Sequence, residues 1–270
     1  MKKISFALLL CALFTFYTAP AFAELLISPI RVVFEDRSRS QTVSLINTSD
    51  KTRTYRIEFY DTQMDENGKY ENITRTGNFP EGYIPASDFL RYSPRQVTLG
   101  PHESQQVRVA VRKPQGLAVG EYRSHMILKQ LAQLDDIENT VDRVSMAVRA
   151  NISFSIPVIV RHGQLEAQAK IEDVRYGTNE EDENGLFVKL SRQGNSSSYG
   201  SLMVYTPDNR IVEEAVSELN NVAIFTEAPE RNIFVRFNKP VSSGQQLIIT
   251  YEGREDSEGR LYDETTYTLP

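Results

Sequence analysis

Residues 144–160, VSMAVRANISFSIPVIV, constrain the fold more than any other part of the chain. Every even-numbered position of this stretch is apolar: Val144, Met146, Val148, Ala150, Ile152, Phe154, Ile156, Val158 and Val160. A period of two places these side chains on one face of an extended strand. The stretch has 17 residues, whereas a strand usually has about five or six. It therefore predicts one long β-strand, in which Pro157, without an N–H donor, indicates a bend or an edge position.

Two interpretations of this strand are open. It is either a core strand that continues into a linker, or an edge strand whose apolar row receives a partner. The second is considered because an uncovered flat edge would otherwise promote aggregation. The periodicity alone does not choose between them.

Shorter alternating runs occupy residues 55–59, 107–111, 233–237 and 247–251. Turn signals separate the runs, at Asn67-Gly68, Gly100-Pro101, Asn184-Gly185, Pro207-Asp208 and Ser243-Gly244. Many short alternating strands with turns between them are typical of β-sandwiches, so the predicted fold class is all-β. One segment differs, because the apolar residues of 211–219 have helical spacing and indicate a short helix near 211–220.

The pattern changes near His162, where Arg161-His162-Gly163 ends the long alternating stretch and a new run begins at 165–171. We therefore expect two domains, residues 24–162 and residues 163–270. Both lengths are ordinary for a single β-sandwich domain.

The first 23 residues have the three parts of a secretory signal peptide. Lys2 and Lys3 form a basic start, residues 6–17 are an apolar stretch, and AFA at 21–23 is a small-x-small cleavage site. The apolar stretch is shorter than the roughly 20 residues that a membrane-spanning helix needs. We expect cleavage after Ala23, export across the inner membrane and no membrane insertion.

Cleavage would leave 247 residues and, because Lys2 and Lys3 are removed from a chain of net charge −6, a net charge of −8. Cys11, the single cysteine, would leave with the signal. The mature chain is then expected to have no disulfide and no thiol nucleophile, although it enters an oxidising compartment. Its acidic charge argues against a nucleic-acid partner.

The sequence has no recognisable catalytic or metal-binding motif. The three histidines, His102, His125 and His162, lack the i, i+2 or i+4 spacing of a metal site, and no phosphate loop, GxSxG or HExxH is present. We therefore expect no metal, no cofactor and no enzymatic activity. A hydrolase whose carboxylates meet only in the folded chain stays open as an alternative.

Three segments of the first expected domain carry a family resemblance. They are LLISPIRVVFED (25–36) followed by VSLINTSDKTRTYRIEFY (43–60), then FLRYSPRQVTLGPHESQQVRVAVR (89–112), and GEYRSHMIL (120–128) leading into 144–160. In combination they resemble the periplasmic pilus-assembly chaperones, and residues 186–210 add a weaker likeness. The resemblance implies two immunoglobulin-like β-sandwich domains in an L or boomerang arrangement, located in the periplasm.

The resemblance also implies a mechanism of binding. A pilus subunit of this kind lacks its last strand, and the chaperone fills the open groove with the last strand of its own first domain. The implied donor residues are Val144, Met146, Val148 and Ile152. The implied partners are a pilus subunit and an outer-membrane usher, and the free edge also allows self-association of the unbound protein.

In the family, two basic residues anchor the C-terminal carboxylate of the subunit. Arg31 matches the first of them, and its planar guanidinium can hold a carboxylate through two N–H groups. Ser153 stands where the second basic residue is expected. Arg149 shares the face of Ser153 but lies about 13 Å along the strand, which makes it a weak candidate for that role.

Arg123 matches a family arginine that helps to hold the two domains at a fixed angle through a buried ionic cluster. The sequence does not assign its acidic partners. The alternative to a chaperone is a self-sufficient secreted structural or adhesive protein, in which two sandwiches satisfy every strand internally.

Overall fold

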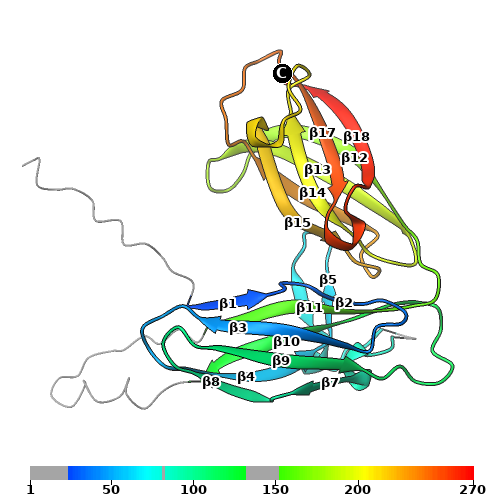
Figure 1. Ribbon diagram of the computed structural model, residues 1–270. Coiled ribbons are helices and arrows are strands. Elements are labelled where there is room, and N and C mark those ends of the chain that lie inside the picture. The colour runs from blue at the N-terminus through cyan, green and yellow to red at the C-terminus, as the bar shows by residue number, and fades with distance from the viewer. Residues whose placement is uncertain (1–23, 81–82, 132–151) are drawn as a thin grey trace, which may run out of the picture.

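The computed structural model describes residues 24–80, 83–131 and 152–270. Nearly all of its regular structure is extended, which confirms the all-β prediction. The strands form two β-sandwiches that meet at an angle, so that the molecule has the shape of an L (Figure 1). The predicted arrangement of two sandwich domains is therefore confirmed.

The first sandwich consists of two sheets. One contains, in order, β1 (Leu25–Ser28), β3 (Ser40–Asn47), β9 (Ser104–Val111) and β7 (Leu90–Ser93). The other contains β2 (Val32–Phe34), β11 (Ser153–His162), β10 (Gly120–Leu131), β4 (Arg53–Tyr60) and β8 (Gln96–Leu99). The alternating apolar residues of these strands point inward and form one core, with Phe34, Val43 and Tyr55 fully buried. Hydrophobic burial on both inner faces is what holds the two sheets together.

The start of the chain contributes to both sheets. β1 pairs with β3 in one sheet, and β2, only a few residues later, pairs in parallel with β11 in the other. The connecting residues 29–31 therefore cross from one sheet to the other at the end of the sandwich.

A hairpin extends from the first sandwich toward the second (Figure 1). It consists of β5 (Thr62–Met64) and β6 (Tyr70–Asn72), and it is followed by the one-turn helix α2 (Ile73–Thr76). The turn between β5 and β6 uses Gly68 at a positive φ of 80°, a conformation that glycine adopts at little cost. A single turn of 3-10 helix, η1 (Ala86–Phe89), leads into β7.

The second sandwich also has two sheets. One contains β12 (Ala167–Thr178), β13 (Asn184–Gly194) and β16 (Glu230–Arg236), and the other contains β15 (Ser217–Ile224), β14 (Ser198–Tyr205), β17 (Gln246–Gly253) and β18 (Leu261–Thr268). Two 3-10 turns, η3 (Val212–Glu214) and η4 (Glu255–Ser257), lie outside the sheets. The last strand of the first sandwich ends at His162 and the first strand of the second begins at Ala167. The expected boundary after residue 162 stays a prediction.

The helix expected near 211–220 is wrong. The segment forms only the short turn η3 and then enters β15. The reason is a backbone contact: the N–H of Val216 donates to the carbonyl of Val204 in β14 at 2.7 Å, which pulls this part of the chain onto the sheet. The apolar residues do not share a helical face, because Ile211 is exposed and Ala215 is buried.

Within the described ranges, no helix has the length and apolar character needed to cross a membrane. In the same part of the chain, no group of three or more His, Cys, Asp or Glu side chains is placed to hold a metal ion.

Candidate functional site

The outer side of β11 is only partly covered. β10 pairs with β11 along its whole length, from Ser153 to His162. On the other side, β2 pairs only with Val158, Ile159 and Val160. In the described part of the chain, residues 153–157 of β11 therefore have an open edge, with backbone groups available to a further strand.

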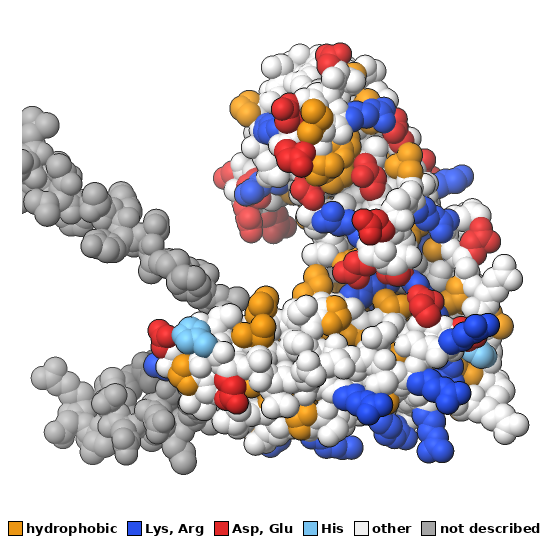
Figure 2. All heavy atoms as spheres, viewed as in Figure 1, with side chains coloured by type: hydrophobic (Ala, Val, Ile, Leu, Met, Phe, Trp, Pro, Cys, Tyr) orange, Lys and Arg blue, Asp and Glu red, His pale blue; other side chains and the backbone are white. Residues whose placement is uncertain are grey.

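A second open edge belongs to β1, which pairs with β3 on one side and with no other described strand. The two open edges border one pocket of about 420 Å³ between the domains. Its apolar lining residues are Leu25, Leu26, Ile27, Ile30, Phe154, Ile156, Pro157, Ala223 and Phe225, and its polar ones are Arg31, Tyr70, Ser155, Tyr199 and Asn221. Figure 2 shows hydrophobic side chains gathered on the surface of the first domain that faces the hollow between the domains.

Several of these apolar side chains are open to solvent. Leu26 is 52% exposed and Ile30 is 48% exposed. Exposed apolar side chains beside two free strand edges are typical of a site that is completed by another chain.

Arg31 is the charged residue of this pocket, and its side chain is only 1% exposed. Its guanidinium carbon lies 4.3 Å from the centroid of the Tyr199 ring. Its Nη2 is 3.5 Å from Ser197 Oγ, and its Nε is 3.7 Å from Asp256 Oδ1. Nε and Nη1 have no hydrogen-bond partner in the described protein. A buried N–H without an acceptor is costly, so these two groups set Arg31 apart from the paired charged residues of the domain interface.

The sequence analysis singled out Arg31 only from the family resemblance, and nothing in the sequence indicated this burial. Ser197, Tyr199 and Asp256 belong to the second domain, so the side chain of Arg31 also joins the first domain to the second.

A second interdomain cluster centres on Arg161, which the sequence analysis did not single out. Its guanidinium contacts Glu121 and Glu35 of the first domain and Asp256 of the second. Glu121 also accepts a hydrogen bond from the backbone N–H of Ser197 at 3.2 Å. The only signal in the sequence was a charged residue directly after an apolar run, which by itself does not indicate partners.

Arg123 lies in a third group of polar contacts between the domains. It forms an ion pair with Glu227 of the second domain and donates to the carbonyl of Thr62 at 3.0 Å. Its guanidinium carbon is 3.8 Å from the centroid of the Phe225 ring. The backbone N–H of Met64 also donates to Glu227, at 3.2 Å. Glu227 thus supplies an acidic partner that the sequence left unassigned.

His125 lies beneath this group and is buried. Its Nδ1 is 2.7 Å from Thr62 Oγ1. Burial, together with the positive charge of Arg123, lowers the pKa of His125 to about 3. The imidazole is therefore neutral at physiological pH.

Apolar contacts accompany these ion pairs. Met64 of the hairpin and Ile159 of β11 pack with side chains of the second domain, namely Tyr199, Ala223, Phe225 and Ala228. The hairpin is also held by its backbone, because the N–H of Asn232 donates to the carbonyl of Glu66 at 2.6 Å. Together these contacts hold the second domain against the first.

Most of the expected donor residues cannot be placed. Val144, Met146, Val148 and Arg149 lie outside the described residues, and their roles stay predictions. Ile152 is described, directly before β11, and its side chain is 46% exposed.

Ser153 is the first residue of β11 and is exposed. The register of β2 and β11 pairs Val32 with Val158, which places Arg31 level with Pro157. Ser153 is four residues before Pro157, or about 13 Å along the strand. The residue level with Arg31 on β11 is therefore a proline, and the replacement of the second basic anchor by Ser153 stays a prediction.

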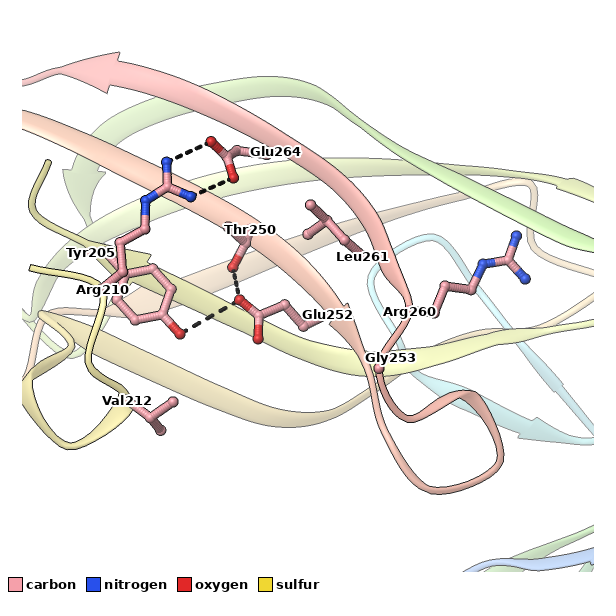
Figure 3. Close-up of a pocket in the computed structure, with 10 residues that line it drawn as sticks. Tyr205, Arg210, Val212, Thr250, Glu252, Gly253, Arg260, Leu261 and Glu264 are labelled. Atoms are coloured by element: carbon pink, nitrogen blue, oxygen red, sulfur yellow. Dashed lines mark hydrogen bonds and ion pairs between the residues drawn. The ribbon is translucent and has the colours of Figure 1, made fainter.

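A further pocket, of about 390 Å³, lies on the second domain and is lined mainly by residues of β14, β17 and β18 and the turns beside them (Figure 3). Its charged side chains already have partners. Arg210 makes two contacts of 2.8 Å with Glu264, and Glu252 accepts hydrogen bonds from Thr250 at 2.5 Å and from Tyr205 at 3.5 Å. Burial and the charge of Glu252 raise the pKa of Tyr205 to about 12. Arg260, the remaining charged residue of the lining, donates to the carbonyl of Ala167. None of these charged groups is a buried donor without a partner in the described protein, as Nε and Nη1 of Arg31 are.

No family model matches the chain, and no curated protein matches it. Among solved structures it is similar to the class 5 fimbriae chaperone CfaA, with 14% identity over 91% of this chain and 99% of the other, and a TM-score of 0.45. It is similar to the E. coli chaperone DraB, with 14% identity over 91% and 96% of the two chains and a TM-score of 0.46. It is also similar to a Salmonella enterica structure of the SafA pilin in complex with the SafB chaperone, with 12% identity over 93% and 99% and a TM-score of 0.44. Similarities at this level do not assign a function to this chain.

Proposed function

We propose that this protein is a periplasmic chaperone, not an enzyme, that binds an incomplete fibre subunit by lending it an edge strand and delivers it to an outer-membrane usher. One observation carries the proposal: the open edges of β1 and of residues 153–157 border the same apolar pocket, and Arg31 is part of its lining.

The two edges can pair with one further strand. A strand placed between them would bond to both through its main chain and set its alternate side chains against the apolar wall. Burying each such side chain is worth about 1.5–3 kcal/mol, so three or four would hold a subunit without covalent chemistry. Val144, Met146 and Val148 would extend the apolar row of β11 and lengthen the contact.

Arg31 supports the part of the proposal that concerns the end of the subunit. The lining of the pocket includes no acidic side chain, and Arg31 has two N–H groups without an acceptor. Its ion pair with Asp256 is loose, at 3.7 Å, whereas Asp256 lies 2.6 Å from Arg161. A C-terminal carboxylate can therefore bind Arg31 without displacing the stronger pair.

The location follows from the proposal together with residues 1–23, which have the pattern of a cleaved signal peptide. A chaperone of this kind would meet its subunits as they emerge unfolded from the inner membrane.

The test is isolation of the tagged mature protein from periplasm, with native mass spectrometry of the complex. We expect a one-to-one complex with a small secreted protein, lost in Arg31→Met. The matched control is Arg37→Met, which removes an exposed arginine of the same domain. Arg31→Met keeps the apolar stem of a buried side chain, and its unfolding midpoint checks that the fold survives.

A wild-type protein that stays a monomer when isolated from cells that also produce pilus subunits would contradict the proposal. The self-sufficient structural or adhesive protein would then be the better interpretation. Normal capture by a folded Arg31→Met variant would leave the chaperone in place and remove Arg31 as its anchor.

A further inference from the structure

The pocket between the open edges contains a hydrogen-bond donor besides Arg31 that has no partner. Tyr70, on strand β6 of the hairpin, lines the pocket, and its hydroxyl makes no hydrogen bond within the described residues. Its side chain is about half exposed. A free hydroxyl beside an arginine with free N–H groups provides two different donors to one anion.

The ring of Tyr70 is fixed by its neighbours. Its centroid lies 4.9 Å from that of His125 and 6.3 Å from that of Phe225, in edge-to-face and tilted arrangements. The guanidinium carbon of Arg123 lies 5.6 Å from the same ring. Contacts on several sides hold the ring in place, so little side-chain entropy is lost when its hydroxyl forms a hydrogen bond.

The electrostatics around Tyr70 favour an anion. Burial raises its pKa, and the positive charges of Arg123, Arg231 and Arg31 oppose that rise. The net shift is upward, so the phenol keeps its proton and remains a donor at neutral pH. Three guanidinium groups close enough to act on one hydroxyl give this end of the pocket a positive potential, which Glu227 only partly offsets.

We propose that the Tyr70 hydroxyl is a binding contact for the C-terminal carboxylate of the captured strand, donating to one oxygen while Arg31 donates to the other. This inference rests on the proposed function, because it concerns the strand that would occupy the pocket between the two open edges. A carboxylate has two oxygens and accepts several hydrogen bonds, and the neutral and the charged donor lie on different elements of the first domain. The hairpin thereby takes part in recognising the end of a chain, in addition to bracing the second domain.

The test uses a short fluorescent peptide of alternating valine and serine residues, made either as the free acid or as the C-terminal amide. Binding of both forms to the full mature protein is measured for the wild type, Tyr70→Phe and Tyr176→Phe. Tyr176→Phe is the matched control, since this partly exposed tyrosine lies on β12 of the second domain and its hydroxyl makes no described hydrogen bond.

We expect Tyr70→Phe to weaken binding of the acid about tenfold, or about 1.4 kcal/mol, as is usual for a hydrogen bond to a charged group. Binding of the amide should be unchanged, and so should both affinities of Tyr176→Phe. Unfolding midpoints for the three proteins show whether Tyr70→Phe retains its fold.

Other outcomes separate the two proposals. An unchanged ratio of acid to amide affinity in Tyr70→Phe overturns the role of Tyr70 and leaves strand capture intact. A wild type that binds acid and amide equally overturns carboxylate recognition altogether. A wild type that binds neither peptide, and captures no subunit from periplasm, overturns the proposed function as well.

Discussion

Arg161 of the first domain and Asp256 of the second form an ion pair across the domain interface, with 2.6 Å between Nη1 and Oδ2. Burial alone would lower the pKa of Arg161, but the carboxylates of Glu121, Asp256 and Glu35 raise it above its ordinary value. The arginine is thus charged at any pH at which the protein is folded. Because this permanent positive charge contacts carboxylates of both domains, it stabilises the angle at which the two domains meet.

Replacing Asp256 with Asn should destabilise the contact between the two domains. Arg161 would keep Glu121 and Glu35, so we expect a loss of about 1–3 kcal/mol in the free energy of unfolding, the usual range for a buried group deprived of one partner. Urea unfolding measures the loss, and small-angle scattering measures the change in the distribution of interdomain angles. Asp173→Asn is the control, because its partner Arg175 is largely exposed. Equal stability and scattering of Asp256→Asn and the wild type would show that the pair does not fix the angle.

Replacing Arg123 with Met should cost more. The change leaves Glu227 in the interface without its cation, and removing one member of a buried pair typically costs about 3–5 kcal/mol. We expect a value near the lower end, because Glu227 is partly exposed and keeps the N–H of Met64. Lys189→Met, which breaks an exposed pair with Glu230, should change the unfolding free energy by less than about 1 kcal/mol. A loss as small as that of the control would contradict the interfacial role of Arg123.

Stability should decrease in mild acid because of His125. Its pKa is about 6.5 in the unfolded chain and about 3 in the folded one, where burial and Arg123 disfavour the cation. Between these two pKa values, His125 is protonated in the unfolded chain but not in the folded one. The stability that the neutral His125 contributes is therefore fully present above about pH 6.5 and is lost as the pH falls toward 3. The slope from this one group is at most about 1.4 kcal/mol per pH unit.

The measurement is the unfolding free energy of wild type and His125→Gln at several pH values between 7 and 5. The variant should lose this part of the acid sensitivity, whereas His102→Gln, at an exposed turn, should keep it. Parallel pH profiles for wild type and His125→Gln would exclude the buried imidazole as the source.

Ile152 offers a test of the proposed donor strand at the end of that strand which the structure describes. A charge at this exposed position would enter the apolar groove of a bound subunit, where an unpaired carboxylate is strongly disfavoured. We expect Ile152→Glu to reduce subunit capture at least tenfold, and Met146→Glu to do the same at an undescribed position. Ile211→Glu, at an exposed isoleucine of the second domain, should capture normally. If Ile152→Glu and Met146→Glu both capture as well as wild type, the donor strand lies elsewhere.

Local periodicity was enough to predict the sandwiches. The alternation in residues 153–160 corresponds to the inward side chains of β11, and Ile156, Val158 and Val160 are buried in the first core. The same rule missed Ile159, which faces outward from that core and is nevertheless fully buried. The second domain covers it, and a contact between domains leaves no periodic signal in either segment.

The site was less accessible to sequence reasoning for the same physical reason. Arg31 and Arg123 were singled out from a resemblance, but their partners Asp256 and Glu227 lie more than a hundred residues away in the chain. The free hydroxyl of Tyr70 becomes informative only when the hairpin places it beside Arg31 in one pocket. For residues 211–220 the prediction of a helix was wrong, because the local apolar spacing is helical but backbone pairing with β14 places this part of the chain on the sheet.

Pro157 limits how far a strand can pair along the open edge of β11. It has no N–H to offer along the open edge of β11, and from Val158 onward β2 already occupies that side. A strand that pairs with β11 therefore runs out of main-chain partners at Pro157, level with Arg31. Under the proposed function, the pocket between the open edges is closed at the Pro157 end and open at the other. A bound polypeptide would then be aligned from its terminus, and its register would not depend on the length of the chain that precedes it.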